Sequence, residues 1–426
     1  MERGRSSVRT RMTARAVDEP HRASTQLELL FDLTFVVAIA AVVAQLGHGV
    51  AEGHAAEVVG PFLQVFFAVW WAWMNFTWFA SSYDTDDVPY RLLTLLQMGG
   101  ALVLAAGVPS AFGDGDYRAV TLGYLLMRVA LVAQWLRAAR EDPEGRGTAL
   151  RYAAGISAVE ILWLARQLVA ELGVLRGTAL VVVFLALVVA ELAVPVWAER
   201  SRTTSWHPHH IAERYSLFTI ILLGESVLAV STGIADVLGS GLHGSLVVVA
   251  GSGLVLLFAL WWLYELEPSA DGLSTRRGRS FLWGYGHYGV FAALAALGAG
   301  LEVAVRQAGT HDILGPGYAV AVPTAAFLAL LWISHSPIVP RSPVRPSVLF
   351  GAAALVLLAP MVGAGVGAIV ALVALVTTAT VVVTVVLTRT SRSSGLPRPS
   401  RDGRLHAVPA GEGGPRMSSG HRRWIR

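Results

Sequence analysis

The chain has 426 residues, of which 54% are hydrophobic and only 15% are charged. Soluble domains carry about 25% charged residues, so this composition predicts an integral membrane protein that crosses the bilayer several times. The sequence contains no cysteine, which excludes disulfides, thiolate metal sites and cysteine nucleophiles. All 33 basic residues are arginine, which excludes mechanisms that need a lysine.

The two ends of the chain account for the positive formal net charge of +4. Residues 1–24 and 389–426 are rich in arginine and lack an apolar run, so we predict disordered tails on either side of a transmembrane domain over 25–388. Because no apolar segment precedes residue 25, no cleavable signal peptide is expected. The basic tails favour membrane lipids as partners and give no support for nucleic acid.

Apolar runs separated by polar connections predict about twelve transmembrane helices in an all-α polytopic fold. The boundaries within 346–390 are the least certain, because one long apolar stretch is divided there only by Pro360 and a glycine-rich segment. The predicted spans are 27–46, 58–80, 91–111, 118–137, 150–171, 177–198, 211–232, 245–266, 281–303, 317–335, 347–362 and 366–388.

Arginine is unevenly divided between the connections. The connections after even-numbered spans and both tails hold most of it, whereas the intervening connections hold only Arg118, Arg176 and Arg306. The positive-inside rule therefore predicts an even number of spans in a bacterial cell membrane, with both termini cytoplasmic.

Glu28 and Asp32 lie in the first predicted span, one helical turn apart on one face. A carboxylate within the hydrocarbon costs about 2.5–3.5 kcal/mol on insertion scales, so it needs a partner, a proton or a water-filled cavity. Glu28 lies in the first turns, where we expect it to reach water at the membrane rim. Asp32 lies nearly two turns in, which makes it the better candidate for a proton or cation site.

The next spans carry further features of this kind. Trp70, Trp71, Trp73 and Trp78 form a stripe in the second span, which we interpret as an interfacial belt. Glu160 and Arg166 in the fifth span are six residues apart and poorly placed to pair, so we expect their partners on other helices. Glu191 in the sixth span is another intramembrane charge.

His207, His209 and His210 precede the seventh span, close to Glu213. Imidazole and carboxylate groups suit zinc, yet the spacing matches no closed zinc pattern. We therefore favour an interfacial helix cap and keep a metal site as the weaker alternative.

Glu225 lies deeper in the seventh span and shares a helix face with Arg214. We predict that Glu213, Arg214 and Glu225 contribute with Glu28 and Asp32 to an ion or proton site, and we ask whether Glu28, Asp32, Glu225 and His287 converge on one cavity. A structural hydrogen bond from a protonated Glu225 is the alternative. His287, among glycines of the ninth span, is either a proton relay or a satisfied core histidine.

A weak internal repeat divides the transmembrane domain into halves at 25–200 and 201–388. Phe67–Trp73 reads like Phe258–Tyr264, and an acidic turn follows each. Six spans per half would give a parallel repeat, although aromatic belts recur in any membrane protein.

Four segments together resemble the bacterial low temperature requirement protein A family. They are Glu28–Phe35, Trp70–Ala80 continuing to Asp87, His209–Phe218 with Leu223–Glu225, and Trp261–Tyr264. Leu30 stands where a second phenylalanine is usual, and Glu265 and Glu267 make the fourth segment more acidic than is common. The resemblance implies an integral membrane protein connected with growth at low temperature, and it implies no agreed biochemical activity.

The intramembrane carboxylates favour a proton- or cation-linked transporter or channel. The alternative is a non-transporting scaffold or sensor in which the same carboxylates lock helices together. No Walker A, dinucleotide or HExxH motif is present, so we expect neither an enzyme nor a cofactor; a membrane enzyme using the histidine cluster ranks last.

Overall fold

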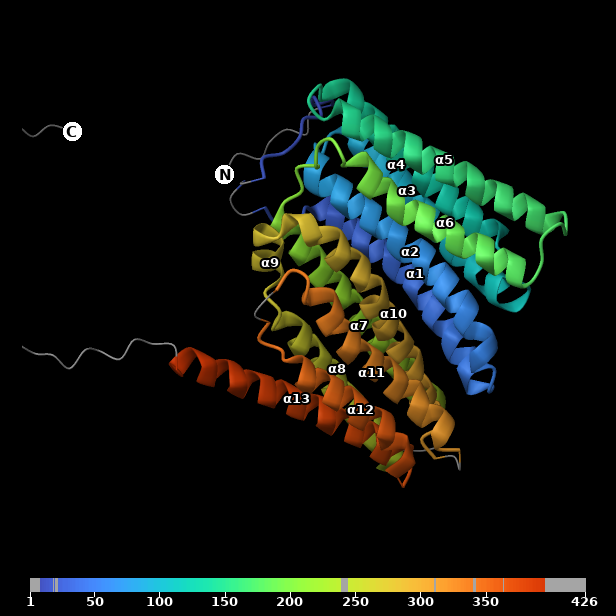
Figure 1. Ribbon diagram of the computed structural model, residues 1–426. Helices are drawn as coiled ribbons and strands as arrows, with labels where there is room; N and C mark the ends of the chain where they lie inside the picture. The colour runs from blue at the N-terminus through green and yellow to red at the C-terminus, as the bar shows by residue number, and fades with distance from the viewer. Residues whose placement is uncertain are drawn as a thin grey trace, which may run out of the picture.

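The computed structural model describes residues 8–17, 19, 22–238, 244–309, 312–339, 342–362 and 364–394. All regular elements within these ranges are helices (Figure 1). They are α1 (Gln26–Ala51), α2 (Ala55–Tyr83), α3 (Val88–Gly113), α4 (Arg118–Glu141), α5 (Arg146–Glu171), α6 (Thr178–Ala198), α7 (Pro208–Leu238), α8 (Gly244–Glu265), α9 (Ser269–Thr275), the 3-10 helix η1 (Arg277–Arg279), α10 (Ser280–Arg306), α11 (Leu314–His335), α12 (Pro346–Val362) and α13 (Val366–Ser394).

Each of the twelve predicted spans corresponds to one of these helices, so the prediction of an all-α polytopic membrane protein is confirmed. Among the described residues, eleven helices are long and apolar enough to cross a bilayer, while α12 is apolar but has only 17 residues. The helix α12 ends at Val362 and the next begins at Val366, within the predicted glycine-rich segment. The short elements α9 and η1 were not predicted.

The helices form two groups, α1–α6 and α7–α13, and several contacts of the first group recur in the second. In the first group α3 packs against α1 and α4, α4 against α5, and α5 against α6; in the second, α10 packs against α7 and α11, α11 against α12, and α12 against α13. The groups lie side by side in Figure 1, and α1 joins them through contacts with α7 and α10. However, α8 packs closely against α13, and among the described residues α2 has no comparably close packing against α6, so the parallel repeat stays a prediction.

Glycine sets the spacing between α3 and α4. A Cβ atom added at Gly123 would lie 2.4 Å from the backbone nitrogen of Leu104 and 2.5 Å from the carbonyl oxygen of Gly100. Small residues at such contacts let the backbones of two membrane helices approach closely. α3 also packs against α1, which carries Glu28 and Asp32.

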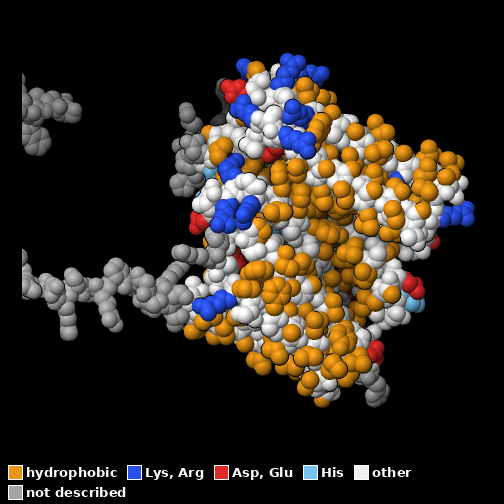
Figure 2. Space-filling view, viewed as in Figure 1, with side chains coloured by type: hydrophobic (Ala, Val, Ile, Leu, Met, Phe, Trp, Pro, Cys, Tyr) orange, Lys and Arg blue, Asp and Glu red, His pale blue; other side chains and the backbone are white. Residues whose placement is uncertain are grey.

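The surface separates hydrophobic from arginine side chains. In Figure 2, hydrophobic side chains cover the middle of the molecule, and arginine gathers at the end that holds the N-terminal segment and α9, called here the arginine-rich end. Leu33, Val37 and Ile161 are among the exposed large hydrophobic residues. Apolar side chains exposed over the middle of helices long enough to span a bilayer are suited to contact with lipid.

Residues 8–17 lie in extended contact with the arginine-rich ends of the helices, in contrast to the disorder predicted for 1–24. The backbone N–H of Met12 donates to Glu141 Oε2 at 2.6 Å, and that of Thr10 donates to Asp87 Oδ2 at 2.8 Å. The Met12 side chain is fully buried. Sequence composition could not reveal this packing, because the segment forms no element of its own. The predicted C-terminal tail begins within α13, and residues 395–426 lie outside the described residues.

Candidate ion-pair site between α1, α2 and α7

Glu28 is held at the start of α1 by a capping box. Its backbone N–H donates to Thr25 Oγ1 at 3.3 Å, while its Oε2 accepts from the Thr25 N–H at 2.7 Å. The side chain is fully buried, so the expectation that Glu28 reaches water at the membrane rim is wrong. The helix α1 packs against α7, whose Arg214 Nη1 is 3.1 Å from Glu28 Oε1.

Asp32 lies one turn further along α1 and contacts the same guanidinium. Arg214 Nη2 donates to Asp32 Oδ1 at 2.5 Å, and Trp73 Nε1 donates to the same oxygen at 2.7 Å. Asp32 Oδ2 is buried and has no hydrogen-bond partner within the described part of the chain. The forked guanidinium thus bridges two carboxylates through separate nitrogens, a geometry that lysine could not reproduce.

Three helices each supply two side chains one turn apart to this site. Side chains spaced by four residues lie on the same helix face, so short segments of α1, α2 and α7 are sufficient to build it. All six are buried, and together they are called the Arg214 cluster: Glu28 and Asp32 from α1, Trp73 and Thr77 from α2, and His210 and Arg214 from α7.

Charges nearer the arginine-rich end complete the electrostatics. Arg22 Nη2 lies 3.8 Å from Glu28 Oε1 and 3.7 Å from Asp84 Oδ2, and Arg15 Nη1 lies 3.7 Å from that aspartate oxygen. Burial and then the charge of Glu28 raise the pKa of Asp84 to about 6. Arg15 also pairs with Glu19, at 2.5 Å between Nη2 and Oε1, so these two arginines and Arg214 face four carboxylates: Glu19, Glu28, Asp32 and Asp84.

The histidines before and within α7 have separate roles. His210 Nε2 lies 3.0 Å from Glu28 Oε1 in the buried cluster. His207 precedes α7, and its Nδ1 accepts from the His210 N–H at 3.4 Å, consistent with the predicted helix cap. His209 lies outside the Arg214 cluster and lines a cleft at the arginine-rich end together with Glu213. Among the described residues, no group of three or more histidine or acidic side chains is arranged to hold a metal ion.

Comparison with known proteins shows the family to which the chain belongs. Residues 23–387 match the family model described as bacterial low temperature requirement A protein (LtrA). The chain belongs to the LtrA family. It is also 27% identical over 311 residues to an uncharacterized protein of Rhizobium meliloti (strain 1021), covering 67% of this chain and 71% of that protein. No solved structure matches it.

The segments that carry the LtrA resemblance converge in space. Three of the four contribute to the Arg214 cluster: Glu28–Phe35, Trp70–Ala80 and His209–Phe218. The fourth segment ends at Tyr264, whose ring lies 5.9 Å from that of His287. The Arg214 cluster is therefore built from the stretches of this LtrA protein by which its sequence resembles the family.

His287 forms a neighbouring layer. Its Nδ1 lies 2.8 Å from the Trp283 carbonyl oxygen and its Nε2 lies 3.2 Å from Tyr264 Oη, so both ring nitrogens have partners. His335 packs 5.1 Å away, centroid to centroid, and was not identified from the sequence. Tyr215 stacks edge-on against both His287 and Trp73, which connects this layer to the Arg214 cluster without a direct contact between His287 and Asp32.

Glu225 and Glu213 do not join the buried cluster. Glu225 follows Arg214 on α7 by roughly 16 Å of helix rise, and the charge that acts on it is that of Glu302 on α10. Glu213 is half-buried, and its Oε1 accepts from the Ser24 N–H at 3.4 Å. A single cavity shared by Glu28, Asp32, Glu225 and His287 is therefore not formed.

The interpretation of the tryptophan stripe as an interfacial belt is wrong for Trp70, Trp71 and Trp73. Trp70, Trp71 and Trp73 are buried between helices, and two of them donate to carboxylates: Trp73 to Asp32, and Trp71 to Glu191 Oε2 at 2.9 Å. The sequence signal for this role was the presence of carboxylates in neighbouring spans, since most buried indole N–H groups have an acceptor.

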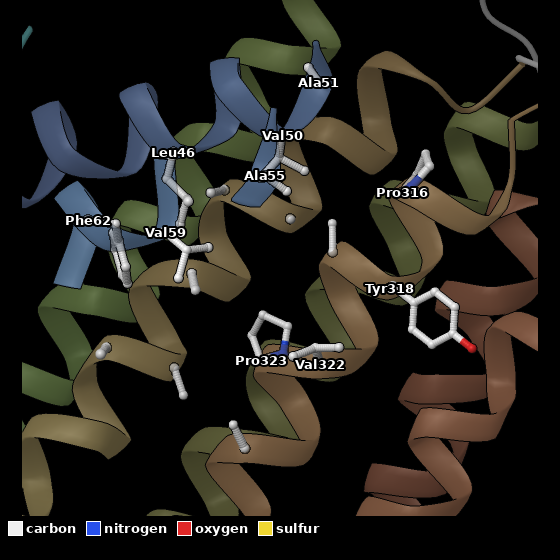
Figure 3. A pocket seen from close by; sticks show the side chains of 18 of the residues that line it. Leu46, Val50, Ala51, Ala55, Val59, Phe62, Pro316, Tyr318, Val322 and Pro323 are labelled. Atoms are coloured by element: carbon white, nitrogen blue, oxygen red, sulfur yellow. The ribbon is translucent and has the colours of Figure 1, made fainter. Parts of the chain in front are cut away.

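An apolar cavity of about 1080 Å³ lies at the opposite end of α1 (Figure 3). Leu46 and Val50 of α1 face Pro316 and Val322 of α11 across it. Its acidic lining residues are Glu52 and Asp312. Ala51 at this cavity is separated from Asp32 by roughly 28 Å of helix rise, so the cavity is distinct from the Arg214 cluster.

Proposed function

We propose that this LtrA protein is a proton-linked transporter in which Asp32 takes up and releases a proton while Arg214 shifts its contacts between Asp32 and Glu28. The supporting observation is one fully buried guanidinium shared by two carboxylates, 2.5 Å from Asp32 and 3.1 Å from Glu28. Protonation of Asp32 would weaken its contact with Arg214 and leave the Arg214–Glu28 pair in place. The proton would thus change the attraction between α1 and α7 without leaving Arg214 unpaired.

A proton suits the Arg214 cluster better than a metal ion. The oxygens of Glu28 and Asp32 that face Arg214 already contact nitrogen donors, so a metal ion would have to displace the guanidinium. Asp32 Oδ2 has no hydrogen-bond partner within the described residues, and it is the oxygen that we assign to the proton. The arginine-rich end carries the N-terminal segment, and we further propose that it faces the cytoplasm of a bacterial cell.

A scaffold or sensor is the second candidate, and the pairing of every carboxylate of the Arg214 cluster with an arginine favours it. In that case the Arg214 cluster only holds α1, α2 and α7 together. The two functions differ in what Asp32→Asn should do. Loss of transport with retained folding supports the transporter, whereas lower stability without any transport in the unmodified protein supports the scaffold.

The experiment uses purified protein in liposomes with an internal pH-sensitive dye. A pH gradient is imposed, the membrane potential is clamped, and proton movement is followed against a panel of monovalent cations and small solutes. We expect proton movement with the unmodified protein, its loss in Asp32→Asn, and its retention in the control Asp86→Asn, which alters an exposed ion pair with Arg91. The absence of proton movement with every solute would contradict the proposal.

A further inference from the structure

A second buried charge cluster lies in the first group of helices and shares no residue with the Arg214 cluster. It joins Arg128 of α4, Glu160 of α5 and Glu191 of α6, which are 1%, 6% and 1% exposed. Each is in a helix long and apolar enough to span a bilayer. One arginine and two glutamates so placed raise the question of which carboxylate balances the guanidinium.

Glu191 is the ionised partner of Arg128. Its Oε1 lies 2.9 Å from Arg128 Nη2 and accepts from Tyr124 Oη at 2.8 Å. Trp163 Nε1 donates to the same oxygen at 3.2 Å, and Trp71 Nε1 donates to Oε2 at 2.9 Å. Four donors from three helices stabilise a carboxylate, which only accepts hydrogen bonds when ionised.

Glu160 has the opposite environment. Both of its carboxyl oxygens are buried and have no hydrogen-bond partner within the part of the chain that the structure describes. The charged groups acting on it are Arg128 and Glu191, which already compensate each other. An ionised Glu160 would add an uncompensated negative charge to the membrane interior, which is strongly unfavourable.

Two small cavities are lined by hydrogen-bond partners of Glu191, while Glu160 itself lines neither of them. Tyr124 and Trp163 line a cavity of about 50 Å³ that extends to Tyr117 before the start of α4. Trp71 lines a second cavity of about 20 Å³ that reaches Thr204 before α7. A water molecule needs about 10–15 Å³ of such space, so both can hold water, and they lie toward opposite ends of the helices.

We propose that Glu160 is a proton-binding site in the centre of the first helix group, holding one proton while Glu191 neutralises Arg128. The proton comes from water, bonds to a carboxyl oxygen of Glu160 and returns to water on release. Asp32 on α1 and Glu160 on α5 would then be separate protonation sites. This inference concerns protonation alone and holds whether or not the protein transports a solute.

The test is infrared spectroscopy of the purified protein in lipid, which detects the C=O stretch of a protonated carboxylic acid. At neutral pH, Glu160→Gln should remove one such band relative to the unmodified protein. Glu171→Gln, which changes an exposed carboxylate on the same helix, is the matched control and should remove none. An unchanged spectrum for Glu160→Gln would overturn the proposal.

Substitution of the partners gives a second, independent readout. In Glu191→Gln, Arg128 loses its carboxylate, so Glu160 should ionise to replace it and the same band should disappear. In Arg128→Gln, neither glutamate has a counter-ion, so both should be protonated and the absorption should increase. Persistence of the Glu160 band in Glu191→Gln would contradict the sharing of one positive charge. Because Glu160→Gln mimics the protonated side chain, it should fold even if Arg128→Gln does not.

Discussion

Replacement of Arg214 should destabilise the protein through the carboxylates that it leaves behind. Arg214 is fully buried and contacts Glu28 and Asp32, so Arg214→Gln removes the shared counter-ion of two buried charges. Loss of one partner from a buried ion pair costs about 3–5 kcal/mol. Asp32→Asn keeps the size of the side chain and leaves Arg214 paired with Glu28, so its cost should be smaller.

A double-mutant cycle measures this coupling. The free energy of unfolding is obtained in detergent for the unmodified protein, Arg214→Gln, Asp32→Asn and the double variant. The double variant carries one buried negative charge fewer than Arg214→Gln alone, so we expect a coupling energy of about 1–3 kcal/mol. The same cycle at the exposed pair of Asp86 and Arg91 should show no measurable coupling. Additivity of Arg214→Gln and Asp32→Asn to within about 0.5 kcal/mol would refute the reasoning.

Three further predictions concern stability and the N-terminal segment. Burial and the charge of Glu28 raise the pKa of Asp84 from 3.8 to about 6, so the folded state binds this proton more tightly than the unfolded chain. The free energy of unfolding should therefore fall as the pH rises from about 4 to about 6, by at most about 3 kcal/mol. Asp84→Asn should flatten that slope when unfolding is measured across this pH range. Gly123→Ala should lower the free energy of unfolding by about 1–3 kcal/mol because the new methyl group meets the α3 backbone, whereas Gly99→Ala, which meets open space, should not lower it. Glu141→Gln should speed trypsin cleavage at Arg11, because it removes the charge that binds the N-terminal segment; an unchanged cleavage rate would show that other contacts hold the segment.

The helices could be predicted from the sequence because their signal is local. A run of about 20 apolar residues specifies a membrane span whatever surrounds it, and all twelve runs became helices. The arrangement of residues 8–17 is not local in this sense. These residues follow no helical or strand period, and their position is set by hydrogen bonds to Asp87 and Glu141, which are distant in the sequence.

The sequence identifies the charged residues within apolar spans, but it does not show which of them contact one another. Asp32 and Arg214 each stand out as charges within an apolar run, but only the packing of α1 on α7 shows that they pair. Glu225 stands out for the same reason, but it lies about three turns along α7 from Arg214 and does not contact Asp32. Arg128 gave the same signal and could have been singled out, since a charge within a span requires a partner.

Proton flux through vesicles that carry Asp32 variants tests the proposed function most directly. Asp32→Glu keeps a carboxylate beside Arg214, whereas Asp32→Asn keeps the shape and removes the exchangeable proton. With equal amounts of folded protein in each vesicle preparation, the proposal predicts flux that is abolished by Asp32→Asn and partly retained by Asp32→Glu. Flux through Asp32→Asn equal to that of the unmodified protein would contradict it.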